Sequence, residues 1–374
     1  MRQWGEIMKV GIHKIAMAAP DDVSGLDRLI DAGEVAPAEI VALIGKTEGN
    51  GGANDFTRGY ATLAFKLLLS RRLGLSTDEV GRRVAFVWSG GTEGVLSPHA
   101  TIFTRTNERR DGSEPRLALG LAETRVLAPE EVGTLTHVRE VAAAVARALA
   151  DAGISDPRQV HYVQVKGPLL TGAAIADADA RGATVVTRDP NGSKVFARGA
   201  MGLGVALALG EIAEAALVEG VVGRRLDLYS AVASTSAGGE LKACEILLFG
   251  NAPGSASDYR IGHGVLADVI DAEGVRNALK SAGLDGAAGA PAPGAIAAVF
   301  AKAEASPTGR VRGWRNTMLS DADINYERHA RAALGAVIAS VTGDPAIFVS
   351  GGTEHQCAPG EAPIAAIVRC PTRA

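Results

Sequence analysis

Three short segments of the chain join a serine to small residues directly after an apolar or β-branched run. They read Ser-Gly-Gly-Thr-Glu at 89–93, Ser-Ala-Gly-Gly-Glu at 236–240 and Ser-Gly-Gly-Thr-Glu at 350–354. A strand that ends in this way presents a hydroxyl and bare backbone N–H groups, and only Gly or Ala lets a ligand approach that backbone closely. One such segment is usually only a turn. Three of them, which we call the serine tips, predict a threefold internal repeat.

A lysine and an arginine precede each serine tip in the same order. Each lysine ends a predicted strand, and each arginine stands at the start of a helical pattern. The three sets are Lys46, Arg58 and Ser89; Lys166, Arg198 and Ser236; and Lys302, Arg331 and Ser350. The Lys-to-Ser spacings of 43, 70 and 48 residues differ, so the order of the elements is what repeats. A single strand ending in Lys is usually a solvated edge, whereas this recurrence indicates one composite site.

These residue types suit nucleophilic attack on a carbonyl group. A serine hydroxyl is a weak nucleophile until a base removes its proton, and a lysine can do so only when its pKa is lowered. Desolvation and neighbouring cations both lower the pKa of a lysine. The backbone N–H after each serine, at Gly90, Ala237 and Gly351, could bind a carbonyl oxygen. Three such sets around a pseudo-threefold axis would fit a small, flat ring of alternating carbonyl and N–H groups. The residues alone leave open which serine reacts.

The elements that must position these residues recur in each third of the chain. We expect three units, at 1–105, 113–250 and 256–374, each with a strand ending in Lys, a helix that opens with Arg, a strand ending in Ser and a further strand. The predicted Lys strands are 40–44, 160–165 and 296–301, and the closing strands are 100–104, 245–250 and 363–368. Polar or small-residue segments at 109–115 and 286–294 mark the boundaries.

The composition excludes several classes of protein. The chain has 374 residues, 47% of them hydrophobic and 21% charged, which is typical of a globular protein. A formal net charge of −4 gives no basic patch for nucleic acid or an anionic membrane. Three cysteines without CxxC spacing argue for a reducing cytoplasm and against structural zinc. We expect no signal peptide and no membrane span, since no apolar run approaches 18 residues.

Longer motifs around the same residues resemble a known family. They are residues 45–51, 89–99, 163–171, 300–307 and 350–356. Together they are similar to the ring-opening cyclic amide hydrolases, the family of cyanuric acid hydrolase and barbiturase. The motifs are long and specific, and the resemblance covers essentially the whole chain. It implies an α/β fold of three similar units around a pseudo-threefold axis with a single central active site, and it implies a homotetramer.

The resemblance also implies a role for each set. Lys46/Ser89, Lys166/Ser236 and Lys302/Ser350 would be three dyads. The residues implied to bind substrate are Arg58, Arg198 and Arg331, together with Lys46, Ser89, Lys302 and Ser350 of the two dyads that do not react. Ser236 would be the nucleophile and Lys166 its base, opening cyanuric acid to carboxybiuret, which loses carbon dioxide to give biuret. No cofactor is expected for this reaction. A barbiturase that gives ureidomalonate is the alternative within the family, and a non-catalytic binder of cyclic ureides is the alternative outside it. The near-identical first and third tips favour a ring with three equivalent faces.

A structural Mg²⁺ or Ca²⁺ near the last tip is a further implication of the resemblance. Its ligands would be hard oxygens, mostly backbone carbonyls. The expected ligand residues are Glu304, Thr353, Gln356, Cys357, Ala358 and Glu361. Two positions depart from the family. Gly167 stands beside Lys166 where relatives have Cys, and we expect different packing there. Glu361 stands where relatives tend to have Gly, which matters little if its backbone carbonyl is the ligand.

Overall fold

The computed structural model describes residues 9–108, 114–284 and 291–371. Within these residues the strands form three four-stranded sheets and one two-stranded ribbon. The sheet orders are β1-β4-β2-β3, β5-β8-β6-β7 and β9-β14-β10-β13. In each sheet the last strand of the order pairs parallel with its neighbour, and the other pairs are antiparallel. The three sheets therefore share one topology, which confirms the predicted repeat.

Each unit arranges its helices between the same strands. The first contains β1 (Lys9–Ala16), α1 (Ser24–Asp31), η1 (Pro37–Glu39), β2 (Ile40–Thr47), α2 (Thr57–Leu73), α3 (Thr77–Gly81), β3 (Ala85–Gly90) and β4 (His99–Thr106). The second contains β5 (Arg116–Glu123), η2 (Pro129–Glu131), α4 (Leu135–Asp151), η3 (Pro157–Gln159), β6 (Val160–Pro168), α5 (Gly172–Ala180), α6 (Ser193–Ala208), η4 (Glu214–Ala216), β7 (Ala233–Gly238) and β8 (Glu245–Ala252). The third contains β9 (Tyr259–Leu266), α7 (Ala272–Ser281), β10 (Ile296–Ala303), β11 (Arg310–Val311), β12 (Trp314–Arg315), α8 (Tyr326–Thr342), β13 (Phe348–Gly351) and β14 (Ala362–Arg369).

Two helix starts were predicted too late. Helix α6 begins at Ser193 and α8 at Tyr326, so Arg198 and Arg331 lie in the second helical turn rather than at its opening. The N-cap of α8 is Asn325, whose side chain accepts a hydrogen bond from the backbone N–H of Glu327. The first turn of each of these helices contains charged side chains, so the pattern of apolar residues did not indicate it as helical. The segments at 109–115 and 286–294 lie largely outside the described residues.

The parallel pairing sets the register of the lysines and serines. Lys46 lies opposite Ser89 on β2 and β3, Lys166 opposite Ser236 on β6 and β7, and Lys302 opposite Ser350 on β10 and β13. Side chains at paired positions of neighbouring strands project from the same face of a sheet. Each lysine is therefore next to the serine of its own unit, as the recurring order predicts.

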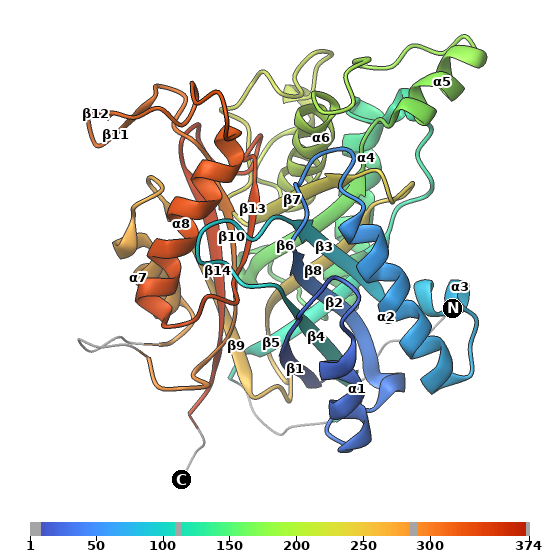
Figure 1. Cartoon of the computed structure of the whole chain (residues 1–374), viewed down its shortest axis with the longest axis vertical. Coiled ribbons are helices and arrows are strands. Elements are labelled where there is room, and N and C mark those ends of the chain that lie inside the picture. Colours follow the sequence, from blue (N-terminus) through green and yellow to red (C-terminus); the bar gives the residue numbers. More distant parts are fainter. Residues whose placement is uncertain (1–8, 109–113, 285–290, 372–374) are drawn as a thin grey trace.

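The strands meet in the middle of the molecule and the helices lie around them (Figure 1). A core shared by all three sheets contains most of the few aromatic side chains in the strands. Its aromatic members include Phe103, Tyr162, Phe249, Phe300 and Phe348. Tyr162 and Phe300 stack with ring centroids 4.7 Å apart, although they belong to different units. A separate apolar core fills the space between each sheet and its own helices.

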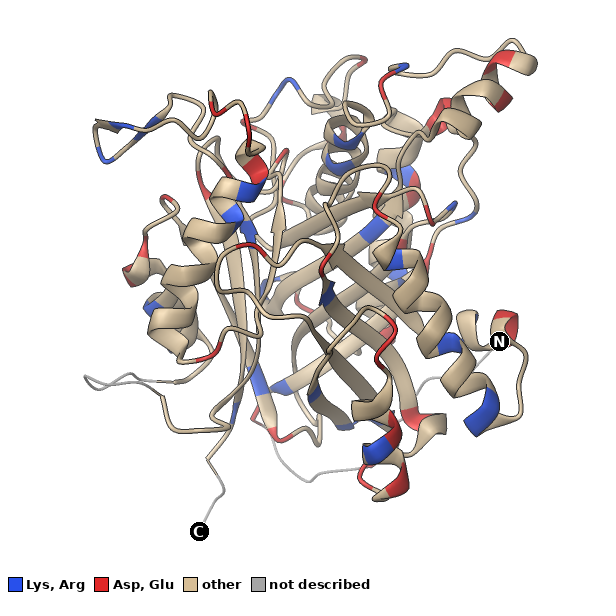
Figure 2. Ribbon diagram, in the orientation of Figure 1, with Lys and Arg blue, Asp and Glu red and all other residues tan. Residues whose placement is uncertain are grey.

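Charged residues alternate in sign over the helices and loops, while the strands have long uncharged stretches (Figure 2). In the part of the chain that the structure describes, none of the helices has the length and apolar character needed to cross a membrane.

Strands β5 and β9 were not predicted, because each contains a glycine that interrupts its apolar pattern. Both glycines lie against a helix. A Cβ atom at Gly120 would lie 1.8 Å from the carbonyl oxygen of Ala148 on α4, and one at Gly262 would lie 2.1 Å from the backbone nitrogen of Ala282, just after α7. These glycines let the helix backbone approach the sheet.

We therefore predict that Gly120→Ala lowers the free energy of unfolding by about 1–3 kcal/mol, because α4 must move away from β5. Urea denaturation followed by circular dichroism measures the change. Gly172→Ala is the matched control, since a Cβ atom there would have no neighbour within 4 Å, and it should leave stability nearly unchanged. Equal stability of both variants would contradict this account of the helix–sheet contact.

Candidate active site

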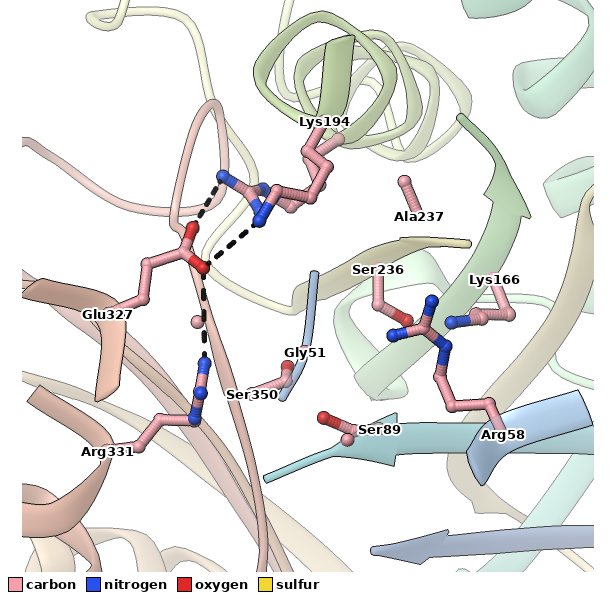
Figure 3. A pocket seen from close by; sticks show the side chains of 13 residues that line it. Gly51, Arg58, Ser89, Lys166, Lys194, Ser236, Ala237, Glu327, Arg331 and Ser350 are labelled. Carbon is pink, nitrogen blue, oxygen red and sulfur yellow. Dashed lines mark ion pairs between the residues drawn. The ribbon is translucent and has the colours of Figure 1, made fainter. Parts of the chain in front are cut away.

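One cavity at the centre of the molecule is lined by residues from all three units (Figure 3). The three serines, the three arginines and the residues after the serines all contribute to it, as predicted. The full lining is Gly51, Arg58, Ser89, Gly90, Lys166, Lys194, Arg198, Ser236, Ala237, Glu327, Arg331, Ser350 and Gly351. Lys166 is the only one of the three dyad lysines in this lining. Lys46 and Lys302, predicted to contact substrate, lie behind it and are fully buried.

Each arginine is held by a glutamate from the serine tip of the next unit. The glutamate is always the fifth residue of the tip. The distances from the guanidinium Nε to the nearest carboxylate oxygen are 3.1 Å for Arg58–Glu240, 2.8 Å for Arg198–Glu354 and 2.9 Å for Arg331–Glu93. No role was predicted for these glutamates from the sequence. Their recurrence at the same place in all three tips was the signal that could have found them.

Each lysine also bonds a residue of another unit. The arginines contact the following unit, whereas the lysines contact the preceding one. Its Nζ donates a hydrogen bond to the backbone carbonyl of the residue before another unit's serine. The bonds are Lys46 to Val349 O at 2.7 Å, Lys166 to Trp88 O at 3.2 Å and Lys302 to Thr235 O at 2.7 Å. The site is thus made of three corners, each with an arginine from one unit and a lysine, serine and glutamate from the next. The corners are Arg58 with Lys166, Ser236 and Glu240; Arg198 with Lys302, Ser350 and Glu354; and Arg331 with Lys46, Ser89 and Glu93.

The three lysines differ in their remaining contacts. Lys46 Nζ lies 3.2 Å from Ser89 Oγ, whereas Lys302 Nζ donates to Gly351 O at 2.8 Å. Lys166 Nζ lies 3.1 Å from Glu240 Oε1. Among the described residues the buried Ser350 Oγ has no hydrogen-bond partner. Register therefore places every lysine beside its serine, while a direct Lys–Ser hydrogen bond is present only at Lys46.

Burial is the main influence on the lysine pKa values. It lowers the pKa of Lys46 well below the ordinary value, with Arg331 adding to the effect. It lowers the pKa of Lys302 to about 7, again helped by an arginine, Arg198. The pKa of Lys166 is lowered by burial and by Arg58, against the opposing charge of Glu240. Each lysine thus has the lowered pKa that a general base requires.

Two further charged residues line the cavity and were missed by the sequence analysis. Glu327 Oε1 lies 3.1 Å from Arg198 Nη2, and Glu327 Oε2 lies 3.5 Å from Lys194 Nζ and 4.0 Å from Arg331 Nη1. Burial opposes ionisation of Glu327, but these cations outweigh it and lower its pKa to about 2. Lys194 and Glu327 each stand four residues before a site arginine, which places them one helical turn away on α6 and α8.

The residues expected to hold a metal ion gather behind the last serine tip. Glu304 Oε2 accepts hydrogen bonds from the backbone N–H of Thr353 at 3.0 Å and from its hydroxyl at 3.2 Å. The side chain of Gln356 is occupied, because it accepts from Thr235 N and donates to Gly352 O. Burial raises the pKa of Cys357, so its thiol stays neutral. Within the described residues no three His, Cys, Asp or Glu side chains form a metal-binding group.

The glycine beside Lys166 has a clear packing reason. A Cβ atom at Gly167 would lie 2.7 Å from both Cys244 Sγ and Met201 Sδ. Cys244 is itself fixed, since its Sγ lies 3.2 Å from His137 Nε2. The thiol of Cys244 and the thioether of Met201 fill the space that a side chain at Gly167 would need.

Serines facing buried lysines of lowered pKa, with arginines and backbone N–H groups around one cavity, form a site suited to opening cyclic amides. The comparisons agree with this class. A family described as "Amidohydrolase ring-opening protein" matches residues 11–369. The chain belongs to this family, and it is a cyclic amide hydrolase by class.

Relatives and a solved structure resemble the chain over nearly its whole length. A "Cyclic amide hydrolase" of Azorhizobium caulinodans is 69% identical over 97% of this chain and 100% of that protein. A "Cyanuric acid amidohydrolase" of Bradyrhizobium diazoefficiens is 53% identical over 96% of this chain and 98% of that protein. A "Barbiturase 1" of Nocardioides sp. is 46% identical over 97% and 98%. A solved structure titled as cyanuric acid hydrolase superposes with a TM-score of 0.92 at 48% identity, covering 97% of this chain and 100% of that one.

Proposed function

We propose that the protein hydrolyses cyanuric acid to carboxybiuret, with Ser236 as nucleophile and Lys166 as its base. The observation that carries the assignment is that Lys166, alone among the three dyad lysines, lines the cavity. Ser236 is also partly exposed, whereas Ser89 and Ser350 are buried at 8% and 3% exposure. This corner therefore joins the partly exposed hydroxyl to a buried amine that lines the cavity, with Arg58 beside them.

In the proposed reaction Lys166 removes the proton of Ser236 Oγ as this oxygen attacks a ring carbonyl carbon. The backbone N–H of Ala237 and the guanidinium of Arg58 stabilise the negative charge that develops on the carbonyl oxygen. The C–N bond then breaks, and the leaving nitrogen takes the proton from Lys166. Water cleaves the resulting acyl-serine to carboxybiuret, which loses carbon dioxide and leaves biuret. Atoms balance with one water consumed for each ring.

The other two corners hold the ring. Ser89 with Gly90 N–H and Arg331, and Ser350 with Gly351 N–H and Arg198, would bind the two carbonyls that do not react. All three lysines bond backbone carbonyls, but Lys46 and Lys302 do not line the cavity, so their proposed role is to fix the serine tips rather than to take up a proton. This division explains why three similar corners need only one reactive pair.

Substitution of the nucleophile tests the proposal directly. Wild-type protein should release carbon dioxide and biuret from cyanuric acid, and Ser236→Ala should lower kcat by at least about a thousandfold while still binding the ring. Calorimetry measures the binding, and product assays measure the turnover. Ser89→Ala should retain more activity than Ser236→Ala. If the wild type shows no turnover, and both it and Ser236→Ala bind the ring equally well, the protein is instead a cyclic ureide-binding protein. A faster rate on barbituric acid than on cyanuric acid would indicate a barbiturase.

The pH dependence should report on Lys166. The amine must be neutral to act as base, so activity is present above its pKa and falls as pH drops through it. Glu240 raises this pKa against the effects of burial and Arg58. Glu240→Gln should therefore move the acidic limb of kcat/KM to lower pH. Glu93→Gln is the matched control, because Glu93 acts on Lys46, and it should leave the position of that limb unchanged.

A structural Mg²⁺ or Ca²⁺ at Glu304 is a second part of the proposal. The Glu304 carboxyl is buried, and burial together with Glu354 raises its pKa to about 7. A divalent cation would compensate this buried group, and the carbonyls of the 353–361 loop are ligands of the type that Mg²⁺ and Ca²⁺ prefer. Bound there, the ion would stabilise the loop that carries Ser350 and Glu354. It would take no part in proton transfer.

Removal of the cation should lower thermal stability. Wild-type protein treated with EDTA should regain about 2–5 °C in Tm when Mg²⁺ or Ca²⁺ is added back. Glu304→Gln should abolish this gain, since it removes the carboxylate ligand. Glu361→Gln should keep the gain, because only the backbone carbonyl of residue 361 is expected to bind. The same Tm gain in both variants would place the ion elsewhere.

We also propose, from the resemblance, a homotetramer in the cytoplasm. The three cysteines support a reducing compartment, because Cys244, Cys357 and Cys370 are all free thiols. Light scattering of the purified protein measures the assembly state.

A further inference from the structure

The position beside each dyad lysine, on the antiparallel neighbour of its strand, differs among the three units. The pairing of the strands gives these neighbours, the last by continuation of the register of β10 and β14: His99 for Lys46, Glu245 for Lys166 and Pro363 for Lys302. Of the three dyad lysines, only the one that we propose as the base therefore has a carboxyl group at this position.

The pairing of the second sheet extends this position into a row across all four strands. Glu123 on β5 lies opposite Glu245 on β8. Glu245 in turn lies opposite Lys166 on β6, which lies opposite Ser236 on β7. Paired positions of neighbouring strands project from the same face of a sheet, and in antiparallel pairs their Cβ atoms are about 4.5–5.5 Å apart. The proposed nucleophile and base are therefore one end of a row of four polar side chains, and Glu123 is the other end.

A second cavity, of about 220 Å³, is lined by both Glu245 and Glu123. It lies between the first two units, because its walls include parts of β2 and β3 as well as of β5 and β8. Arg82 and Arg83 also line it and are exposed, so the cavity reaches the molecular surface. Its volume has room for several water molecules. Since Lys166 lines the active-site cavity, the neighbouring side chains of Lys166 and Glu245 lie between the two cavities.

The carboxyl group of Glu245 is poorly satisfied where it lies. Its Oε2 is buried and, among the residues that the structure describes, has no hydrogen-bond partner. Burial raises the pKa of Glu245 to about 8, and the neighbouring charge of Glu123 adds to this effect. The backbone N–H of Phe86 and the cations Lys66 and Lys166 act in the opposite direction. A carboxyl group with such a pKa gains and loses its proton near neutral pH.

Glu240 is close to Lys166 as well, but it is unsuited to carry a proton. Its Oε1 lies 3.1 Å from Lys166 Nζ. Burial opposes ionisation of Glu240, but Lys166 and Arg58 outweigh it and lower the pKa of Glu240 to about 2. At neutral pH this carboxylate therefore stabilises the charge of Lys166 without accepting its proton. Glu245 is left as the neighbouring carboxyl group that can be protonated.

The proposed reaction leaves Lys166 with one proton to lose in each turnover. The water that cleaves the acyl-serine gives one proton to Lys166, which returns it to Ser236 Oγ, while the other proton stays on the new carboxyl group of carboxybiuret. That group ionises at neutral pH, and the neutral Lys166 is the base beside it. The product then leaves as an anion, and Lys166 stays behind as an ammonium group that is only 1% exposed. It must lose this proton before it can act as a base again.

We propose that Glu245 takes this proton from Lys166 and passes it to water in the second cavity, so that the base is restored from behind the active site. An N–H bond of the ammonium group breaks as an O–H bond forms on the Glu245 carboxylate, directly or through one bridging water. The carboxyl group then releases the proton to the water of the second cavity and is a carboxylate again. This inference rests on the proposed ring-opening function and adds to it a residue that acts through Lys166 and never touches the ring.

The first turnover and the later turnovers of Glu245→Gln test the inference. Glutamine keeps the size of the side chain but cannot exchange a proton near neutral pH. The first ring should open at the wild-type rate because Lys166 starts neutral, whereas every later ring waits for Lys166 to lose its proton by a slower route. We therefore expect a burst of about one ring per active site, followed by a steady-state rate about tenfold below that of wild type. Rapid quenching, with chromatography of the remaining cyanuric acid and of biuret, measures both phases.

Two further variants separate proton transfer from charge and folding. Glu123→Gln is the matched control, because it removes a carboxylate from the same cavity at an exposed position that is not next to Lys166, and it should give no burst. Glu245→Ala opens space between Lys166 and the second cavity. Added imidazole, a small base that can carry the proton, should raise the steady-state rate of this variant and leave that of wild type unchanged. This variant also replaces Glu245→Gln if circular dichroism shows that the glutamine variant is unfolded.

The outcomes distinguish the two levels of the proposal. If wild type opens neither cyanuric acid nor barbituric acid, the proposed function is wrong and this inference fails with it. If wild type opens the ring and Glu245→Gln keeps the wild-type steady-state rate, only the role of Glu245 is overturned. The same holds if the first turnover of the variant slows as much as the later ones, because Glu245 would then serve to position Lys166 rather than to carry its proton.

Discussion

Buried lysines that bond the backbone of a neighbouring unit are the constraint on which the structure depends. Lys46, Lys166 and Lys302 are at most 1% exposed, and a buried amine without partners would be strongly destabilising. Each finds a carbonyl acceptor on the serine strand of another unit. These serine strands are sheet edges, whose unpaired carbonyls also need partners. One set of bonds therefore satisfies the lysines, covers the sheet edges and joins the units, so the site is complete only when all three have assembled.

The arginine–glutamate pairs also join the three units to one another, but in the opposite direction to the lysine bonds. Arg58, Arg198 and Arg331 each reach the tip of the following unit, while the lysines reach the tip of the preceding one. Both directions converge on the serine tips, which leaves the hydroxyls and the N–H groups after them little freedom. Fixed donors around a small cavity are what stabilisation of a developing oxyanion requires. Loss of a single pair should disturb the corner that shares it more than the sheet that carries it.

Much of this frame could be predicted from the sequence because its determinants are local and repeated. The order Lys, Arg, Ser recurs in every third, and the parallel register then places Lys166 opposite Ser236 without any further information. The partners of the arginines could not be assigned, because Glu240 pairs with Arg58 from a distant part of the chain. Lys194 and Glu327 were missed for a related reason. Both residues lie in the first turn of a helix, and the spacing of hydrophobic residues does not reveal those turns. A comparison of the three repeats also overlooks positions at which the three units differ. Strands β5 and β9 were missed because each has a glycine at the point where a helix backbone packs against it, and this glycine interrupts the apolar pattern of the strand.

The differences between the units matter as much as their similarity. A ring with three equivalent faces in a cavity with three equivalent corners would give no corner an advantage, so a reactive pair must come from asymmetry. The structure has asymmetry at two levels. Behind the cavity, Lys46 bonds Ser89 and Lys302 bonds Gly351 O, while Lys166 reaches the lining and Glu240. Within the cavity, Glu327 lies between two arginines and leaves Arg58 without a carboxylate in the lining. Both differences distinguish the same corner, that of Ser236, although they arise from different units. Repetition builds the frame, and the residues that depart from it give one serine a role that the other two lack.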